Sequence, residues 1–469
     1  MPKPKTTKAD KKETQYRVRI RMYRQGLGDC FLLTFPKGTG EPAQVMIDCG
    51  VVLGTEKPNV VMTKVAQHIS NETKGKVDAL VITHEHWDHL SGFTKAQAQA
   101  VFEKMQFGEL WMAWTEKDGQ PLAEQLRKDR EAKQAAARAA KERLAKSKAK
   151  GAKERAQRMN AVLEFFGAAK GKDGKEGGEG AEGTAGALAF LKRKIANQRT
   201  FEPGGTPFTI PGVEGVRVFV LGPPMDAQML GSTDPRQGEG YGLAVKSMSL
   251  ASAFAAGLGI EERSGDRELA QPFAASFRRA IPTQPGDLYC RPKNDWRRID
   301  ADWLAVGERL ALQLDRDTNN TSLVLAFELM DTQEVLLFVG DAQAGNWRSW
   351  EALKWKVKNK DGENVEVSAF DLLERTIFYK VGHHGSHNAT LREKGLGKMK
   401  NPELVAMIPV DEKVAHDVKN WKHMPLPALR DQLKKQCAAF IQADTNRVEG
   451  VKPGTKRIES KPLYFDCFL

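Results

Sequence analysis

Three histidines and two carboxylates stand within six consecutive residues of this sequence. The segment THEHWDHLSG (83–92) contains His84, His86, Asp88 and His89, whereas the whole chain has only nine histidines. Imidazole nitrogens and carboxylate oxygens together are ligands that suit Zn²⁺, Mn²⁺ or Fe²⁺. On a turn, His84 and His86 can face one cation while Asp88 and His89 face another. The spacing therefore predicts a metal centre rather than a chance cluster on a surface turn.

Residues of the same ligand types follow other predicted strands. They are Asp48 near the end of 44–50, Asp341 near the end of 334–342, and His383 with His384 within 376–386. Residues at strand ends can meet at one edge of a sheet, where loops carry function. A strand buried in the core is a rigid support for a metal site. We therefore expect these residues to converge on the first cluster, although the sequence does not decide which of the two adjacent histidines binds metal.

Apolar runs typical of strands recur between these polar groups. They predict strands within 16–35, 44–50, 79–83, 108–116, 216–224, 321–329, 334–342, 376–386 and 404–410, with a closing helix near 427–440. The composition, 41% hydrophobic, is sufficient for a sizeable core. The sequence thus favours one large α/β domain with insertions.

Two long stretches interrupt the predicted strands. Residues 121–166 are rich in Ala, Lys, Arg and Glu with few helix breakers, which predicts a long helix or helical hairpin, and a Gly-rich linker follows at 171–186. Because the helical face is charged and has few large apolar residues before 162–166, we expect it to project into solvent. Residues 225–317 contain few strong strands, with one predicted helix near 247–257. The predicted organisation is a disordered basic tail at 1–15 and one domain at 16–469, interrupted by a basic helical insertion at 121–200 and a second, irregular insertion at 225–317.

The net charge of +12 is concentrated in two segments. Residues 1–15 contain five lysines against two acids, and residues 121–160 contain thirteen basic residues against five acids. A basic helix can attract the phosphates of DNA or RNA. A helix face that is merely solvated is the alternative.

The cysteines and the apolar runs bear on location. Five scattered cysteines with no CxxC pair indicate reduced thiols in a cytoplasmic protein. No apolar stretch reaches the ~18–20 residues of a membrane helix, and no apolar segment follows the N-terminal lysines, so we expect neither a membrane segment nor a secretory signal.

The metal-ligand segment resembles a known family signature. THEHWDHLSG matches the HxHxDH motif of the metallo-β-lactamase superfamily. The segments GLGDC, IDCG, VLGPP, NNTSLVL, FVGDA and KVGHHGS follow the order found in the soluble hydrolase domain of ComEC-like bacterial DNA-uptake proteins. The matching pieces cover roughly residues 16–116, 216–224 and 319–425. The resemblance implies an α/β fold of four layers, αββα, with two insertions that have no counterpart in the family.

By this resemblance, the site would hold two divalent metal ions, Zn²⁺ or Mn²⁺. His84 and His86 would bind the first metal, Asp88 and His89 the second, Asp341 would bridge them, and His383 or His384 would add a ligand. Asp48 would support the ligand loop by hydrogen bonding. The family's third motif supplies a further histidine, yet this chain has none between His89 and His383. The first metal would keep three protein ligands and water, as a catalytic zinc often does, and a mononuclear or manganese-preferring site is the alternative.

The chemistry that the resemblance implies is hydrolysis. A metal pair lowers the pKa of a bound water and so supplies hydroxide as nucleophile, which Asp88 and Asp341 could orient as catalytic residues. His423, in NWKHMP, loosely matches a histidine–proline turn of the family and could protonate a leaving oxygen. A surface role without chemistry is the alternative for this histidine.

Three functions fit these expectations. The favoured one is a nuclease or phosphodiesterase acting on nucleic acid or nucleotides, guided by the basic helix at 121–160. The second is another hydrolase on the same scaffold, such as a lactonase, a thioesterase or an amidase, because one fold hosts many chemistries. The third is an interaction protein whose helical arm binds a protein partner or a second copy of the chain.

Overall fold

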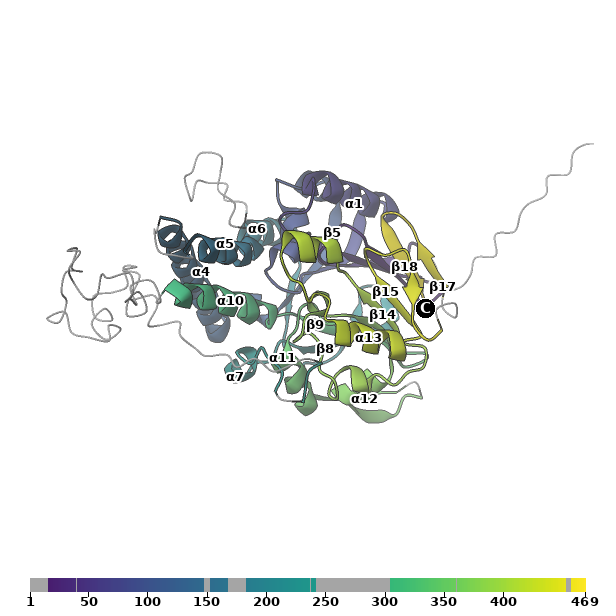
Figure 1. Cartoon of the computed structure of the whole chain (residues 1–469). Coiled ribbons are helices and arrows are strands. Elements are labelled where there is room, and N and C mark those ends of the chain that lie inside the picture. Colours follow the sequence, from purple (N-terminus) through teal and green to yellow (C-terminus); the bar gives the residue numbers. More distant parts are fainter. Residues whose placement is uncertain are drawn as a thin grey trace, which may run out of the picture.

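A computed structural model describes residues 16–38, 40–146, 152–167, 183–236, 238–241, 304–359, 361–452 and 457–469. Two large mixed sheets and the helices around them make up these residues, so the α/β class expected from the sequence is confirmed (Figure 1). The basic tail at 1–15 and the helix expected near 247–257 lie outside the described residues, as does most of the Gly-rich linker.

The first sheet has eight strands. In sheet order they are β17 (Arg457–Ser460), β18 (Tyr464–Phe468), β1 (Arg19–Tyr23), β2 (Phe31–Phe35), β3 (Ala43–Ile47), β4 (Lys76–Val81), β5 (Gln106–Ala113) and β6 (Gln198–Phe201). The strands from β3 to β6 run parallel, whereas the others pair antiparallel. Parallel neighbours bring the carboxyl ends of β3 and β4 to the same edge of the sheet.

The second sheet also has eight strands. In sheet order they are β16 (Val448–Glu449), β15 (Ala439–Gln442), β14 (Val405–Ile408), β13 (Thr376–Lys380), β10 (Glu334–Phe338), β9 (Val324–Leu329), β8 (Val213–Gly222) and β7 (Phe208–Ile210). Here β10, β13, β14 and β15 are parallel. A separate hairpin joins β11 (Lys354–Lys358) to β12 (Asn364–Ser368).

The two sheets share one apolar core. Phe31 of the first sheet meets Phe338 of the second edge to face, with ring centroids 5.6 Å apart, and Phe338 meets Phe327 at 5.9 Å. The outer face of the first sheet packs against α1 (Pro58–Glu72), α3 (Gln99–Phe102) and α6 (Thr184–Lys194). The outer face of the second packs against α11 (Ala344–Ser349), α12 (Ala369–Glu374) and α13 (Pro427–Gln436). Burial on both faces explains why the central strands are apolar throughout rather than alternating.

Three further helices lie side by side at one end of the sheets (Figure 1). They are α4 (Pro121–Lys146), α5 (Ala152–Leu163) and α10 (Leu304–Asn319). Buried alanines of α4 and Ala311 of α10 contribute to the cluster that joins the three helices, and such small side chains allow close approach. The helical prediction for 121–166 is confirmed, but its expected projection into solvent is wrong, because α10 from the other interrupting stretch packs against both helices.

The end of the chain departs from expectation. We expected the core to close with the helix near 427–440, yet β15 to β18 follow it, and β18 pairs with β1 in the first sheet. The buried side chain of Arg21 donates two hydrogen bonds to Asp466, at 2.7 and 2.6 Å, which fixes this pairing. Local patterns do not reveal a partner strand 445 residues away.

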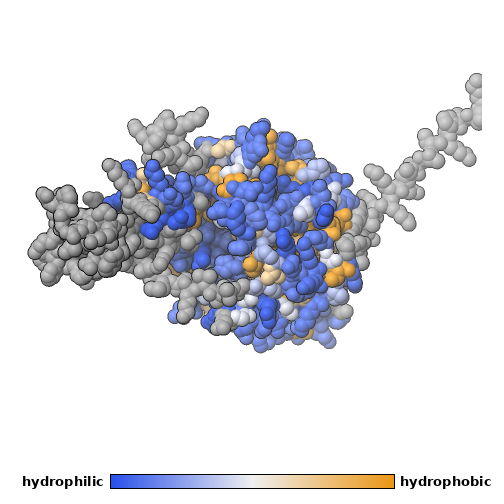
Figure 2. All heavy atoms as spheres, viewed as in Figure 1, coloured by the Kyte–Doolittle hydropathy of each residue, from blue (hydrophilic) through white to orange (hydrophobic). Residues whose placement is uncertain are grey.

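The exterior of the described residues is mostly polar. Figure 2 shows hydrophilic residues over most of this face, with apolar residues in small groups. Among the described residues, no helix is long and apolar enough to span a bilayer. Cys30, Cys49 and Cys437 are buried free thiols.

Candidate metal centre

The predicted ligand residues converge where strands of the two sheets end. His84, His86, Asp88 and His89 follow β4, Asp48 follows β3, Asp341 follows β10, and His383 and His384 follow β13. All of them except His383 are less than 5% exposed. The expectation that these strand ends meet in space therefore holds in the structure.

Asp48 fixes the loop that carries the histidines. Its carboxylate accepts hydrogen bonds from the backbone nitrogen of Thr83 (2.8 Å), from the Thr83 hydroxyl (2.6 Å) and from Nδ1 of His89 (2.8 Å). Because His89 donates its Nδ1 proton to Asp48, its other nitrogen, Nε2, is directed at Asp341, whose Oδ2 is 3.3 Å away. This is the outer support that metal-binding histidines usually have.

The two adjacent histidines have different partners. Nδ1 of His384 donates to the carbonyl of Pro409 (2.8 Å), so Nε2 of His384 faces Asp88, at 2.8 Å, and Asp341, at 3.9 Å. His383 instead contacts the hydroxyl of Ser386 through Nδ1, at 2.8 Å. Both histidines have positive φ, 40° and 49°, a conformation that non-glycine residues rarely adopt and that functional sites often contain. His384 is thus the one that joins the acidic cluster.

Four buried side chains form a group that can hold a metal ion. Asp29, His89, Asp341 and His384 each offer a ligand atom within 4.8 Å of the others. Oδ1 of Asp29, Oδ1 of Asp88 and Nε2 of His89 are buried without a hydrogen-bond partner. Buried polar atoms are rarely left unpaired, and an ion is one explanation for such atoms. The donor set and its unpaired atoms therefore fit a divalent cation.

Asp29 and Lys380 are site residues that sequence reasoning missed. Nζ of Lys380 lies 2.5 Å from Asp29 and 3.4 Å from Asp341, and it donates to the carbonyl of Gly340 (2.7 Å). Burial alone lowers the pKa of Lys380, but the two carboxylates raise it above its usual value. Both residues belong to motifs, GLGDC and KVGHHGS, and this membership was the available signal. Lys380 is the last residue of β13, and Asp29 lies in the turn between β1 and β2.

The cluster has opposed charges. Burial raises the pKa of Asp88, yet His89 and His384 lower it to about 2, and His89, Lys380 and His384 likewise hold the pKa of Asp341 well below its usual value. Burial lowers the pKa of His89, but surrounding carboxylates, first Asp341, raise it well above its usual value. The carboxylates are therefore ionised, and in the metal-free protein a proton on His89 takes the place of a cation.

His84 and His86 differ from His89 in their protonation state. Burial lowers the pKa of His86 to about 3 and that of His84 well below its usual value, so both imidazoles are neutral. Nε2 of His84 lies 3.1 Å from Nδ1 of His86. Neutral imidazoles are the form that binds metal.

The helical insertion packs onto the metal-ligand loop. Arg130 of α4 forms an ion pair with Glu85, between two of the histidines, at 2.6 Å, and the Thr184 hydroxyl donates to the same carboxylate at 3.0 Å. The rings of Phe165 and Phe166 lie 5.4 and 5.0 Å from that of His86. The insertion thus contributes to the wall of the site.

His423, the predicted proton donor, is exposed. It lies two residues before Pro425, which packs closely against Gly385 next to His384. Its segment therefore borders the cluster, although no contact between the His423 side chain and the cluster is recorded among the described residues.

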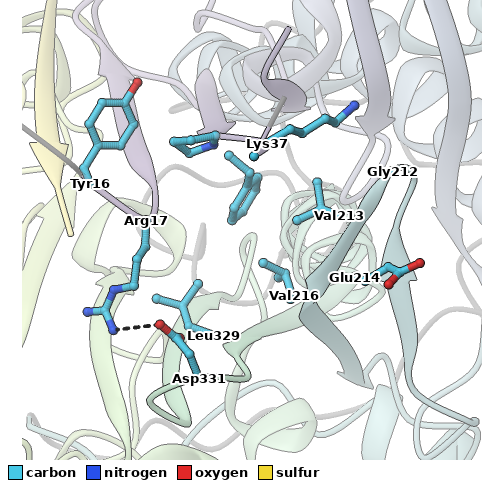
Figure 3. Close-up of a pocket in the computed structure, with 13 residues that line it drawn as sticks. Tyr16, Arg17, Lys37, Gly212, Val213, Glu214, Val216, Leu329 and Asp331 are labelled. Atoms are coloured by element: carbon cyan, nitrogen blue, oxygen red, sulfur yellow. Dashed lines mark ion pairs between the residues drawn. The ribbon is translucent and has the colours of Figure 1, made fainter. Parts of the chain in front are cut away.

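A surface cavity lies far from this cluster. A hollow of about 750 Å³ is lined by Tyr16, Arg17, Lys37, Val213 and Leu329, among others (Figure 3). These residues border the opposite ends of the strands that carry the ligands, because Phe35 pairs with the first residue of β3 and Leu329 with the first of β10. The ion pair drawn there, between Arg17 and Asp331 at 3.8 Å, has no link to the histidines.

No protein-family model, no curated protein and no solved structure matches this chain. What the site can do is therefore argued from its own geometry.

Proposed function

We propose that this chain is a metal-dependent hydrolase of the metallo-β-lactamase type that acts as a nuclease or phosphodiesterase. The observation that carries the proposal is the buried convergence of His89, Asp341 and His384 with Asp88, where ligand atoms lack hydrogen-bond partners. Two sheets packed face to face with helices on both outer faces are consistent with the αββα layers of that family. Buried free thiols favour a cytoplasmic location.

The residues of the cluster would hold one or two divalent cations, Zn²⁺ or Mn²⁺. When bound, such cations acidify water and neutralise charge that develops on a phosphoryl oxygen. Asp88 and Asp341 are ionised and can accept a proton from an attacking water or orient it. Lys380 holds Asp29 and Asp341 near each other, since its ammonium contacts both carboxylates.

A phosphodiester substrate is supported by the basic insertion. Lys128, Arg143, Lys146 and Lys153 are exposed on α4 and α5, where phosphates of a polyanion can approach them. A protein that only binds a partner through its helical arm would not need a set of metal-binding residues next to that arm. A lactonase, thioesterase or amidase would use the same cations on an uncharged carbonyl.

Cleavage assays with two kinds of substrate test the proposal. Wild type with Mn²⁺ or Zn²⁺ should cleave DNA or RNA and a bis-aryl phosphate, and Asp88→Ala/His89→Ala should cleave neither. Replacing the four exposed basic residues by Ala should weaken polyanion binding and its salt dependence but leave cleavage of the small substrate unchanged. These substitutions are preferable to deleting residues 121–200, because deletion would also remove the Arg130–Glu85 pair. Hydrolysis of a lactone or thioester but of no phosphodiester would overturn the phosphodiesterase assignment.

A further inference from the structure

Helix α10 occupies the position next to the first pair of histidines. Asn319, its last residue, is 1% exposed, and Asp315 stands one turn earlier on the same face. Asn319 is the first residue of the NNTSLVL segment, whereas no sequence pattern includes Asp315, and the chain has no histidine between His89 and His383 that could complete a site at His84 and His86. The side chains of α10 are therefore the ones available there.

Three ligand atoms lie at the spacing of a coordination shell. Nε2 of His84 is 3.1 Å from Nδ1 of His86 and 3.1 Å from Oδ1 of Asn319. Metal–ligand bonds of about 2.0–2.2 Å place neighbouring ligand atoms roughly 3 Å apart. The two distances from Nε2 of His84 are thus those expected between ligand atoms of one bound cation.

The nearby hydroxyl protons show which atom of His84 faces this group. The Ser322 hydroxyl donates to the backbone carbonyl of Asn319 (2.7 Å), and the Thr83 hydroxyl donates to Asp48 (2.6 Å). Both hydroxyl oxygens lie near Nδ1 of His84, at 3.3 and 3.1 Å, and can only accept from it. Nδ1 therefore carries the proton, and Nε2 directs a lone pair at the oxygen of Asn319, itself an acceptor.

The remaining nitrogen of His86 faces Asp315. Nε2 of His86 and Oδ1 of Asp315 are buried, have no hydrogen-bond partner and lie 3.9 Å apart. A carboxylate behind a ligating histidine orients its ring and selects its tautomer. With the proton on Nε2, toward Asp315, Nδ1 of His86 is free to bind a cation.

We propose that Asn319 supplies the third protein ligand of a first cation site, beside His84 and His86, and that Asp315 is a positioning residue for His86. The inference rests on the proposed metal-dependent function, whose second site is formed by His89, Asp341 and His384. An amide oxygen is a hard ligand, so the first site should accept Mn²⁺ more readily than a site with three histidines does.

Calorimetric titration of Mn²⁺ and Zn²⁺, with electron paramagnetic resonance of the Mn²⁺ form, tests the inference without an activity assay. Wild type should bind two ions, with the spectrum of a coupled pair. Asn319→Ala should bind one ion and give the spectrum of an isolated Mn²⁺. Asn319→Asp should keep both ions, because it retains an oxygen ligand. Asp315→Asn should lower the binding affinity for one of the two ions about 10- to 100-fold.

Asp317→Asn is the matched control, since Asp317 lies on α10 but bonds to Lys133 and Gln313 instead of the histidines. It should bind two ions as wild type does. Two ions of unchanged affinity in Asn319→Ala would overturn the inference while leaving the proposed function intact. A wild-type protein that binds no divalent ion would instead overturn the proposed function. If Asn319→Ala does not fold, Asn319→Asp and Asp315→Asn still test the inference. If Asn319 only donated an amide proton to His84, the aspartate variant, which has no amide, would lose the ion.

Discussion

Nε2 of His384 lies 2.8 Å from Oδ2 of Asp88, although 296 residues separate the two in the sequence. Asp88 follows a strand of the first sheet and His384 a strand of the second, so this contact joins the two halves of the fold at the cluster. Nδ1 of His384 donates to the carbonyl of Pro409, which fixes the tautomer and directs Nε2 toward the cluster. His383, the adjacent residue, has no such arrangement.

The two histidines should therefore differ in their effect on metal binding. His384→Gln should remove the ion held with Asp88 and Asp341, because a ligating nitrogen is lost. His383→Gln, the matched control, should retain that ion. Metal content after gel filtration measures both, and the reverse pattern would show that His383 is the ligand.

Cation binding should release protons near neutral pH. The folded-state pKa of His89 is raised above its unfolded value of about 6.5, because carboxylates outweigh the effect of burial. In the metal-free protein its proton therefore contributes stability that is fully present below about pH 6.5 and is lost as the pH rises through the folded-state pKa. The pKa of His384 is also raised, because Asp341 and Asp88 outweigh the lowering effect of burial.

Calorimetry in buffers of different ionisation enthalpy measures this release. We expect about one to two protons per second-site ion at pH 7 and weaker binding at lower pH. The melting temperature of the metal-free protein should decline above about pH 6.5, and added cation should reverse the decline. Binding that is independent of buffer and pH would contradict protonated histidines in this cluster.

Arg130 should be important for stability although it lies on the insertion. Arg130→Met leaves Glu85 buried without its counter-charge, and breaking such a pair costs about 3–5 kcal/mol. Lys74→Met is the matched control, because the Lys74–Glu41 pair is equally short at 2.6 Å but largely exposed, and its loss should cost less than about 1 kcal/mol. Chemical denaturation of the two variants gives the free energies of unfolding. Equal losses would mean that the insertion does not support the metal-ligand loop.

His423 should matter only when the leaving group needs a proton. His423→Ala should slow cleavage of a nucleic acid by about 10²–10⁴-fold but leave cleavage of an activated bis-aryl phosphate unchanged, because an aryl oxide leaves unprotonated. Lys422→Ala, at the neighbouring exposed position, should affect neither. An equal loss on both substrates, or none on either, would exclude general-acid catalysis by His423.

Local sequence patterns were sufficient for the strands that carry the ligands and for the helices of the insertion. Strands buried on both faces are continuous apolar runs, and the ligands stand immediately after them, so Asp48, Asp341 and the HEHWDH segment could be placed together. Patterns of this kind do not report contacts between distant segments. The pairing of β18 with β1, the packing of α10 on α4 and the Asp29–Lys380 ion pair depend on such contacts.

The two adjacent histidines show the same limit at the level of one site. Spacing made His383 and His384 equivalent, whereas backbone carbonyls and hydroxyls around the rings distinguish them. The roles of Asn319 and Asp315 were missed because Asp315 belongs to no motif and the NNTSLVL segment, which begins at Asn319, was used only for its order along the chain. Their position beside His84 and His86 follows only from the packing of the helix.

Metal analysis of the purified chain is the most direct measurement of the central claim. We predict bound Mn²⁺ or Zn²⁺ in wild type and loss of at least one ion in Asp341→Asn, which removes a carboxylate oxygen directed at His89 while keeping the shape of the side chain. Wild-type protein that takes up no divalent transition metal under saturating conditions, or an Asp341→Asn variant with wild-type metal content and affinity, would contradict the metal centre.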